Sequence, residues 1–176
     1  MNDLTLYNTI RPLIKTGDHL GWRGDNLIGK IIRKFTADTI NHSELALRLE
    51  YEGLDKRRFN VGALSFGITL HMLSRKLERY NGRVYWYPLK DEYDELRPKI
   101  ASYVLDKIDI KYDYKSLFGQ LLGRVSSDMN KLFCSEICNL AWVSVGIDTG
   151  FPIDGIAPTP HDIDNFNIFR DKIRIL

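Results

Sequence analysis

The chain has 176 residues, of which 44% are apolar and 27% are charged. This length and composition are typical of one globular domain with a sizeable core, and they exclude a disordered chain, a collagen and a coiled coil. The formal charge is only +2 and there are only 2 cysteines, so we expect neither a nucleic-acid partner nor a disulfide-stabilised scaffold.

The N-terminal segment carries no recognisable targeting signal. It lacks a basic stretch followed by an apolar run, and no window of the chain reaches the roughly 18 consecutive apolar residues of a membrane span. The chain shows no internal repeat and no linker rich in proline, glycine or serine. We therefore expect one domain over residues 1–176, located in the cytoplasm or, for a phage-encoded protein, released at lysis without a signal. The sequence leaves the oligomeric state open.

Strand patterns dominate the first half of the chain. Residues 18–22 form a short candidate strand, and residues 57–64 and 67–70 predict further strands. Residues 27–35 have the apolar spacing of a helix. The most regular pattern is the alternation over 42–50, which is typical of a half-buried strand. Its two faces would carry Leu45, Leu47 and Leu49 on one side, and His42, Glu44, Ala46, Arg48 and Glu50 on the other.

Helical patterns dominate the second half. A short helix from Ser74 to Tyr80 precedes the Asn81-Gly82 turn and an aromatic strand at 83–89. Longer helices are predicted over 91–107, with Pro98 as an internal irregularity, and over 115–122 and 131–145. Strands followed by helices favour the α+β class, with a small antiparallel sheet packed against helices.

Cys134 is the first candidate for a chemical role, because the pattern places it in the first turn of the helix predicted over 131–145. Unpaired N–H groups and the helix dipole stabilise an anion there, so a thiol forms the nucleophilic thiolate more readily. The alternative is that Cys134 is a small buried apolar residue, as free cysteines usually are. Cys138 lies one turn later, and for it the buried structural role is favoured.

A nucleophilic cysteine needs a base, and His42 is the favoured candidate among the 4 histidines. It opens the alternating strand, and a histidine at a strand end that faces a cysteine at a helix start is typical of papain-type enzymes. We interpret His19, His71 and His161 as structural or solvated residues.

Metal and cofactor chemistry find little support in the sequence. Cys134 and Cys138 would hold a zinc ion only with two further ligands, and no histidine pair has the short spacing of such sites. The chain has no GxGxxG, Walker A or GxSxG motif, and its carboxylates suggest no glycosidase pair. We therefore expect no metal and no other cofactor.

Four segments occur in a characteristic order: GDHLGWRG at 17–24, LIGKIIRKFT at 27–36, NHSELAL at 41–47 and LFCSEIC at 132–138. Residues 67–89, 112–114 and 158–162 fit the same pattern. In this order and spacing the chain resembles the circularly permuted NlpC-like papain-fold cysteine peptidases, known as the YiiX group, over residues 17–165. That group is related to the lecithin:retinol acyltransferase-like enzymes.

The resemblance implies a permuted papain-like fold with Cys134 as the nucleophile and His42 as the base, and with the backbone N–H of Cys134 in an oxyanion hole. The group commonly has a third polar residue, often Glu, on the strand after the histidine strand, where this chain has Gly62. Glycine cannot orient an imidazole. The substitutes that the sequence offers are Asn60, on the same strand face as residue 62, Glu44, on the same face as His42, or a bound water.

Three functions are open at this point. The first is a thiol hydrolase that cleaves an amide bond of the peptide or peptidoglycan (cell-wall) type through a covalent acyl-enzyme. The second is a lipid acyltransferase or ester hydrolase with the same dyad, for which the amphipathic, basic segment 27–35 would face a membrane. The third is a non-catalytic binding domain. Trp22, Tyr112 and Tyr114 are candidates to line a substrate cleft, and core packing is the favoured alternative for them.

Overall fold

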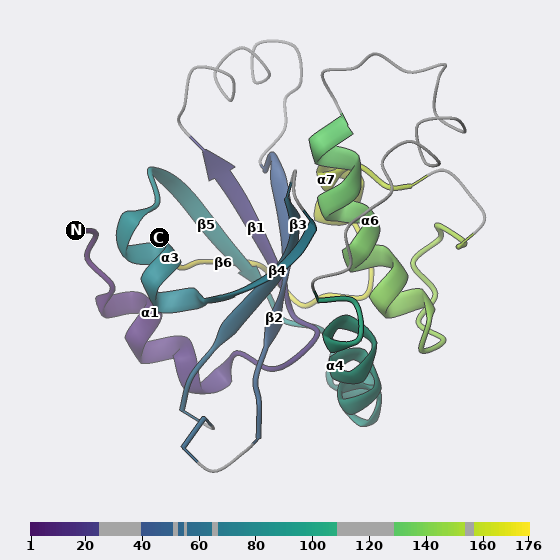
Figure 1. Ribbon diagram of the computed structural model, residues 1–176, viewed down its shortest axis with the longest axis horizontal. Coiled ribbons are helices and arrows are strands. Elements are labelled where there is room, and N and C mark those ends of the chain that lie inside the picture. Colours follow the sequence, from purple (N-terminus) through teal and green to yellow (C-terminus); the bar gives the residue numbers. More distant parts are fainter. Residues whose placement is uncertain (25–39, 51–52, 55, 65–66, 109–128, 154–156) are drawn as a thin grey trace.

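The centre of the fold is a six-stranded antiparallel sheet. The computed structural model describes residues 1–24, 40–50, 53–54, 56–64, 67–108, 129–153 and 157–176 (Figure 1). The strands lie in the order β4-β3-β2-β1-β5-β6. Their bounds are β1 His19–Gly24, β2 His42–Leu47, β3 Phe59–Leu64, β4 Gly67–Met72, β5 Gly82–Tyr87 and β6 Ile173–Arg174.

Helices cover both faces of the sheet. In Figure 1, α4, α6 and α7 lie on one side of the strands, and α1 and α3 lie on the other. The helical bounds are α1 Thr5–Ile10, η1 Arg11–Leu13, α3 Leu73–Arg79, η2 Asp91–Leu96, α4 Arg97–Leu105, α6 Met129–Val143 and α7 Pro160–Asp164. The expected α+β class, with an antiparallel sheet packed against helices, is confirmed. Within the part of the chain that the structure describes, no helix has both the length and the apolar character to cross a bilayer.

Two apolar clusters fill the space between the sheet and its helices. On the side of α4 and α6, strand residues such as Leu45 and Val61 pack against Ile137 and Trp142. On the opposite side, Trp22 belongs to a cluster that α1 and α3 close. Burial on both faces changes the character of β2. Its predicted polar face is not solvated, because Glu44 and Ala46 are as buried as the leucines.

Several predicted elements differ from the structure in their bounds. The strand predicted over 42–50 ends at Leu47, and the helix predicted over 91–107 is a 3₁₀ segment, η2, followed by α4. Pro98 is therefore not an irregularity within one helix. It occupies the first turn of α4, where proline lacks only an N–H that would be unpaired in any case. The helices predicted over 27–35 and 115–122 lie outside the described residues.

A buried ion pair fixes the chain where β1 begins. The Asp18 carboxylate accepts hydrogen bonds from Arg97 Nη1 at 2.8 Å, from Trp86 Nε1 at 2.8 Å, and from the backbone N–H groups of Lys15 at 2.9 Å and Leu89 at 3.0 Å. The carboxylate is thus tied to β5, to α4 and to the turn before β1. A buried charge with this many donors has a structural function, and it positions the N-terminal end of β1.

Replacing Asp18 by alanine should strongly destabilise the fold. The substitution leaves the Arg97 guanidinium, whose side chain is only 10% exposed, without its buried carboxylate. Removing one partner of such a pair lowers the free energy of unfolding by about 3–5 kcal/mol. Urea denaturation measures the loss, with Asp171→Ala, at an exposed carboxylate, as the control. A change of less than about 1 kcal/mol, the value of an exposed pair, would contradict this role.

Candidate active site

His42, the first residue of β2, contacts two of the other candidate residues. Its Nε2 lies 3.1 Å from Oε1 of Glu44, and the Cys134 side chain is near enough to the ring to influence its pKa. The side chain is 23% exposed, so solvent reaches the ring. The structure thus brings together a cysteine, a histidine and a carboxylate that are far apart in the sequence.

Cys134 is fully buried where α6 packs against β2 and β3. Its Sγ accepts a hydrogen bond from the backbone N–H of Ser43, the residue after His42, with a separation of 3.5 Å. This contact fixes the sulfur against the start of β2. A backbone donor aimed at the sulfur stabilises negative charge on it.

The predicted location of Cys134 in the first turn of its helix is wrong. The helix α6 begins at Met129, so Cys134 lies in its second turn. In that turn the backbone N–H lies within the ladder of bonds to the carbonyl four residues earlier, and the dipole effect has fallen off. Stabilisation of an anion by the helix N-terminus is therefore weaker at Cys134 than it would be in the first turn. The Ser43 N–H and the His42 ring are the groups that polarise the sulfur.

Glu44 is completely buried, and three side chains donate hydrogen bonds to its carboxylate. Oε1 accepts from His42 Nε2 at 3.1 Å and from Lys76 Nζ at 2.6 Å, and Oε2 accepts from Asn60 Nδ2 at 2.8 Å. Burial alone would raise the pKa of Glu44. The hydrogen bonds and charges of His42 and Lys76 outweigh burial and lower that pKa to about 2. The group is therefore an ionised carboxylate at neutral pH.

The charges around His42 favour its protonated form. Burial opposes a charge on the ring, but the charge of Cys134, a hydrogen bond to that sulfur and the Glu44 carboxylate outweigh burial and raise the pKa of His42 to about 10. At neutral pH the ring therefore carries a proton. A protonated imidazole beside the sulfur is placed to give up a proton during a reaction at that sulfur.

Glu44 and Asn60, the two side chains considered in place of the third catalytic residue, make different contacts. Glu44 contacts His42 directly, whereas Asn60 contacts Glu44 and holds its second oxygen. Lys76 belongs to the same cluster and was not predicted from the sequence. It lies in α3, 4.3 Å above the ring of Trp22. One lysine in a short basic helix gives no sequence signal that it points toward a buried carboxylate.

Of the three aromatic residues predicted to line a cleft, the structure describes only Trp22. Trp22 is fully buried in the cluster between the sheet and α1 and α3, with its ring against Tyr80 and Lys76. It pairs with His42 in the antiparallel register, so the two side chains share one face of the sheet. Core packing, not substrate contact, is its function. Tyr112 and Tyr114 lie outside the described residues.

The remaining thiol and histidines are separate from this cluster. Burial raises the pKa of Cys138 well above its ordinary value, as expected for a core thiol. His71 and His161 are exposed. His19 is fully buried among Tyr87, Trp142 and Phe169, and neither ring nitrogen has a hydrogen-bond partner in the structure as described.

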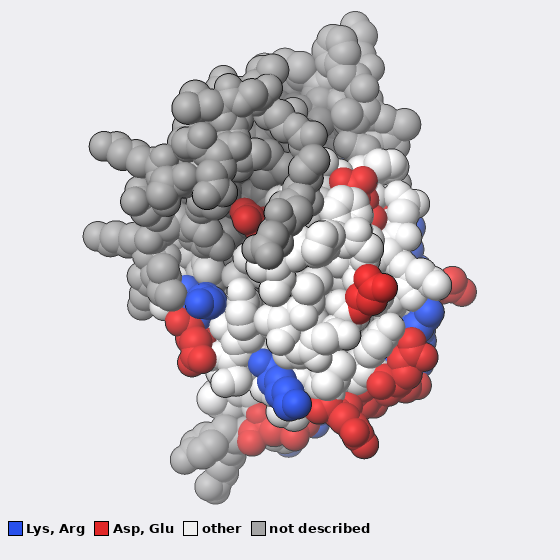
Figure 2. Space-filling view, turned by 90° about the vertical axis from the view of Figure 1, so that its right-hand side faces the viewer, with Lys and Arg blue, Asp and Glu red and all other residues white. Residues whose placement is uncertain are grey.

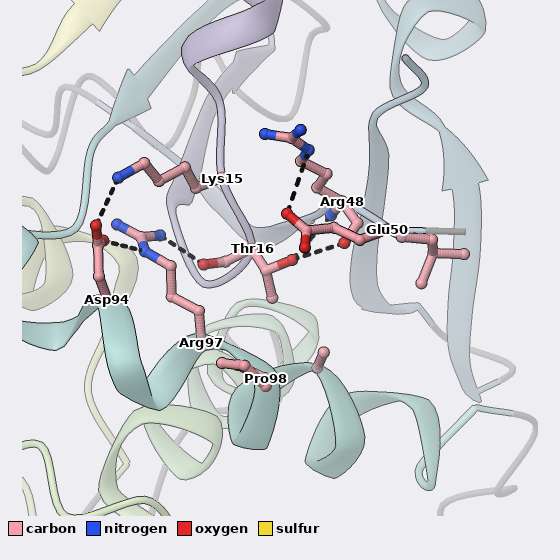
Figure 3. A pocket seen from close by; sticks show the side chains of 9 residues that line it. Lys15, Thr16, Arg48, Glu50, Asp94, Arg97 and Pro98 are labelled. Carbon is pink, nitrogen blue, oxygen red and sulfur yellow. Dashed lines mark hydrogen bonds and ion pairs between the residues drawn. The ribbon is translucent and has the colours of Figure 1, made fainter. Parts of the chain in front are cut away.

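A cavity of about 470 Å³ lies at the opposite end of β2 from His42. Figure 3 shows that its charged side chains are directed toward one another: Lys15 and Arg97 both converge on Asp94, at 2.7 and 2.6 Å, and Arg48 lies beside Glu50 at 3.7 Å. These mutual pairs offset the charge of the cavity wall. We therefore assign this network to the structure that supports β1 and α4, not to the active site.

The comparisons with known proteins show a likeness in fold. Among solved structures, the chain is similar to the crystal structure of metalloprotein yiiX from Escherichia coli O157:H7, a DUF1105 protein. The TM-score is 0.53 with 12% sequence identity, and the match covers 90% of this chain and 96% of the other. No family model matches the sequence, and no curated protein matches it. The structural neighbour belongs to the same YiiX group that the sequence motifs resemble.

The description of this neighbour as a metalloprotein raises the question of a metal in the present chain. Across the described ranges, no group of three or more histidine, cysteine, aspartate or glutamate side chains is arranged to hold an ion. Both oxygens of the Glu44 carboxylate accept hydrogen bonds from nitrogen donors, which a cation would have to displace. The candidate site therefore does not fit a metal, and no chemical step is assigned to one.

The neutral state of His19 predicts a loss of stability in acid. Burial lowers the pKa of His19 from 6.5 to about 3, so below pH 6.5 the unfolded chain binds a proton that the folded chain does not. Its contribution is intact above pH 6.5 and is lost as the pH falls, by about 2 kcal/mol at about pH 5. A His19→Phe variant should lack this part of the acid destabilisation.

Urea denaturation of both proteins between about pH 5 and pH 8 measures the difference. The control is His71→Gln, because His71 is exposed. Parallel pH dependence in His19→Phe and the parent would show that the buried ring does not titrate in this way.

Proposed function

We propose that the protein is a thiol hydrolase with a permuted papain-like fold, and that it cleaves amide bonds through a covalent acyl-enzyme. The observation that carries the proposal is the continuous chain of contacts from Cys134 to His42 to Glu44. Nucleophile, base and orienting carboxylate are the three parts that a cysteine hydrolase needs. The likeness in fold to a member of the YiiX group supports the same conclusion.

The charges of the cluster suit each step of such a reaction. The Cys134 thiolate attacks the carbonyl carbon, and the protonated His42 gives its proton to the leaving amine. The resulting thioester is then attacked by water, from which the neutral His42 takes a proton, and the acid is released. Glu44 holds the ring in one orientation and stabilises its charged form before and after the reaction.

The proposed substrates are peptide amides of the peptidoglycan stem type. The alternative lipid reaction would be helped by a basic surface that attracts anionic headgroups. Figure 2 shows that the face over α4, α6 and α7 carries only scattered Lys and Arg in its described part, with Asp and Glu along one edge. The described part of this face thus offers no basic patch for anionic headgroups, and the preference for an amide substrate rests on the cluster of Cys134, His42 and Glu44.

The test is hydrolysis of purified peptidoglycan fragments, followed by mass spectrometry of the products. Cys134→Ala should abolish cleavage, because it removes the nucleophile, whereas Cys138→Ala, one turn along the same helix, should retain it. Cleavage by Cys134→Ala at the parental rate would exclude the mechanism. Release of fatty acid from phospholipid vesicles without any amide cleavage would exclude the amide substrate and favour the lipid reaction.

A further inference from the structure

Gly62 lies inside β3 without a backbone reason to be glycine. It pairs with Thr69 of β4 in the regular antiparallel register. It is not among the glycines with positive φ, unlike Gly17 or Gly82. A glycine inside a strand weakens the strand, and it often marks a place where another group approaches closely. The reason for glycine at this position must therefore be the space above it.

The Glu44 carboxylate occupies that space. The register that pairs Leu45 with Val61 brings Glu44 beside Gly62 on the same face of the sheet. A Cβ atom at position 62 would lie 2.6 Å from Oε1 of Glu44, 2.7 Å from its Cγ and 2.9 Å from its Cδ. Side chains do not tolerate such distances, so any residue other than glycine would displace the carboxylate.

Lys76 closes the other side of the carboxylate. Its Nζ lies 2.6 Å from Oε1, the same oxygen that accepts from His42. The ammonium group also lies over the ring of Trp22, which is itself fully buried and cannot shift easily. With Asn60 on Oε2, the carboxylate has a fixed position between Gly62, Lys76 and Asn60.

We infer that Gly62 and Lys76 are positioning residues of the proposed hydrolase, which hold the Glu44 carboxylate where it orients His42. This inference rests on the proposed function. It also explains why this chain has Gly62 where the YiiX group commonly has a polar residue. The carboxylate comes from β2, and glycine on β3 leaves room for it. Neither residue touches the reacting sulfur in the described contacts.

Gly62→Ala should fold but react slowly. The added methyl group displaces Glu44 from His42, and a misplacement of about 1 Å in such a site slows the reaction by about tenfold to a hundredfold. The expected loss is in kcat, with KM nearly unchanged. The high-pH limb of the pH–rate profile, where His42 loses its proton near pH 10, should move to lower pH, because Glu44 helps to hold that proton. His71→Gln, at an exposed position on β4, is the control.

A double-mutant cycle tests whether Gly62 acts through Glu44. Gly62→Ala should slow alkylation of Cys134 by iodoacetamide at least about tenfold in the parent, but by less than about twofold in a Glu44→Ala background, since contacting residues are not additive. An equal factor in both backgrounds, or no effect in the parent, would overturn the inference. Amide cleavage by Cys134→Ala at the parental rate would instead overturn the proposed function.

Lys76→Met supplies an independent arm of the same experiment. Methionine keeps a long apolar side chain over Trp22 but removes the ammonium group from Oε1. The alkylation rate should fall several-fold, whereas Arg75→Met, at an exposed neighbour in α3 whose guanidinium pairs with Glu78, should leave it unchanged. Equal rates for Lys76→Met and Arg75→Met would remove Lys76 from the proposed cluster.

Discussion

The buried carboxylate of Glu44 is the constraint around which the centre of this structure is organised. A charge with no exposed surface is stable only if donors surround it. Three elements supply those donors: His42 comes from β2 itself, Asn60 from β3 and Lys76 from α3. The carboxylate thus fixes the position of α3 on the sheet and the rotamer of His42 at the same time. Folding and the proposed chemistry depend on the same contacts.

The helix on the other face completes the arrangement. The α6 helix packs on β2 and β3, and this packing places Cys134 against the backbone of Ser43 and the ring of His42. Because Ile137, Ala141 and Trp142 of the same helix belong to the core, the sulfur has a rigid support. The second buried carboxylate, Asp18, ties the start of β1 to β5 and α4 in a similar way, through Trp86 and Arg97. The two ionic clusters therefore hold neighbouring strands of one sheet.

The sequence predicted the parts of the site that follow from local pattern. Strand alternation placed His42 and Glu44 on one face, and the cysteine in an apolar helix was recognised as the nucleophile candidate. The same alternation predicts a solvated polar face, whereas Glu44 is buried. A periodic pattern does not show that a second layer of helices covers that face. The start of α6 was misplaced by two residues, which is the usual precision of a helix boundary. Lys76 was missed because its contact with Glu44 spans 32 positions in the sequence.

The central claim is that the Cys134 side chain and the ionised Glu44 carboxylate together keep the His42 ring protonated. An NMR titration of the His42 ring tests this claim most directly, because it needs neither a substrate nor access to the buried sulfur. The account predicts that the ring stays protonated through neutral pH, with a pKa of about 10, and that Cys134→Ala lowers this pKa by at least about one unit. A His42 ring in the parent that loses its proton near pH 6.5, the value of an unperturbed histidine, would contradict the account.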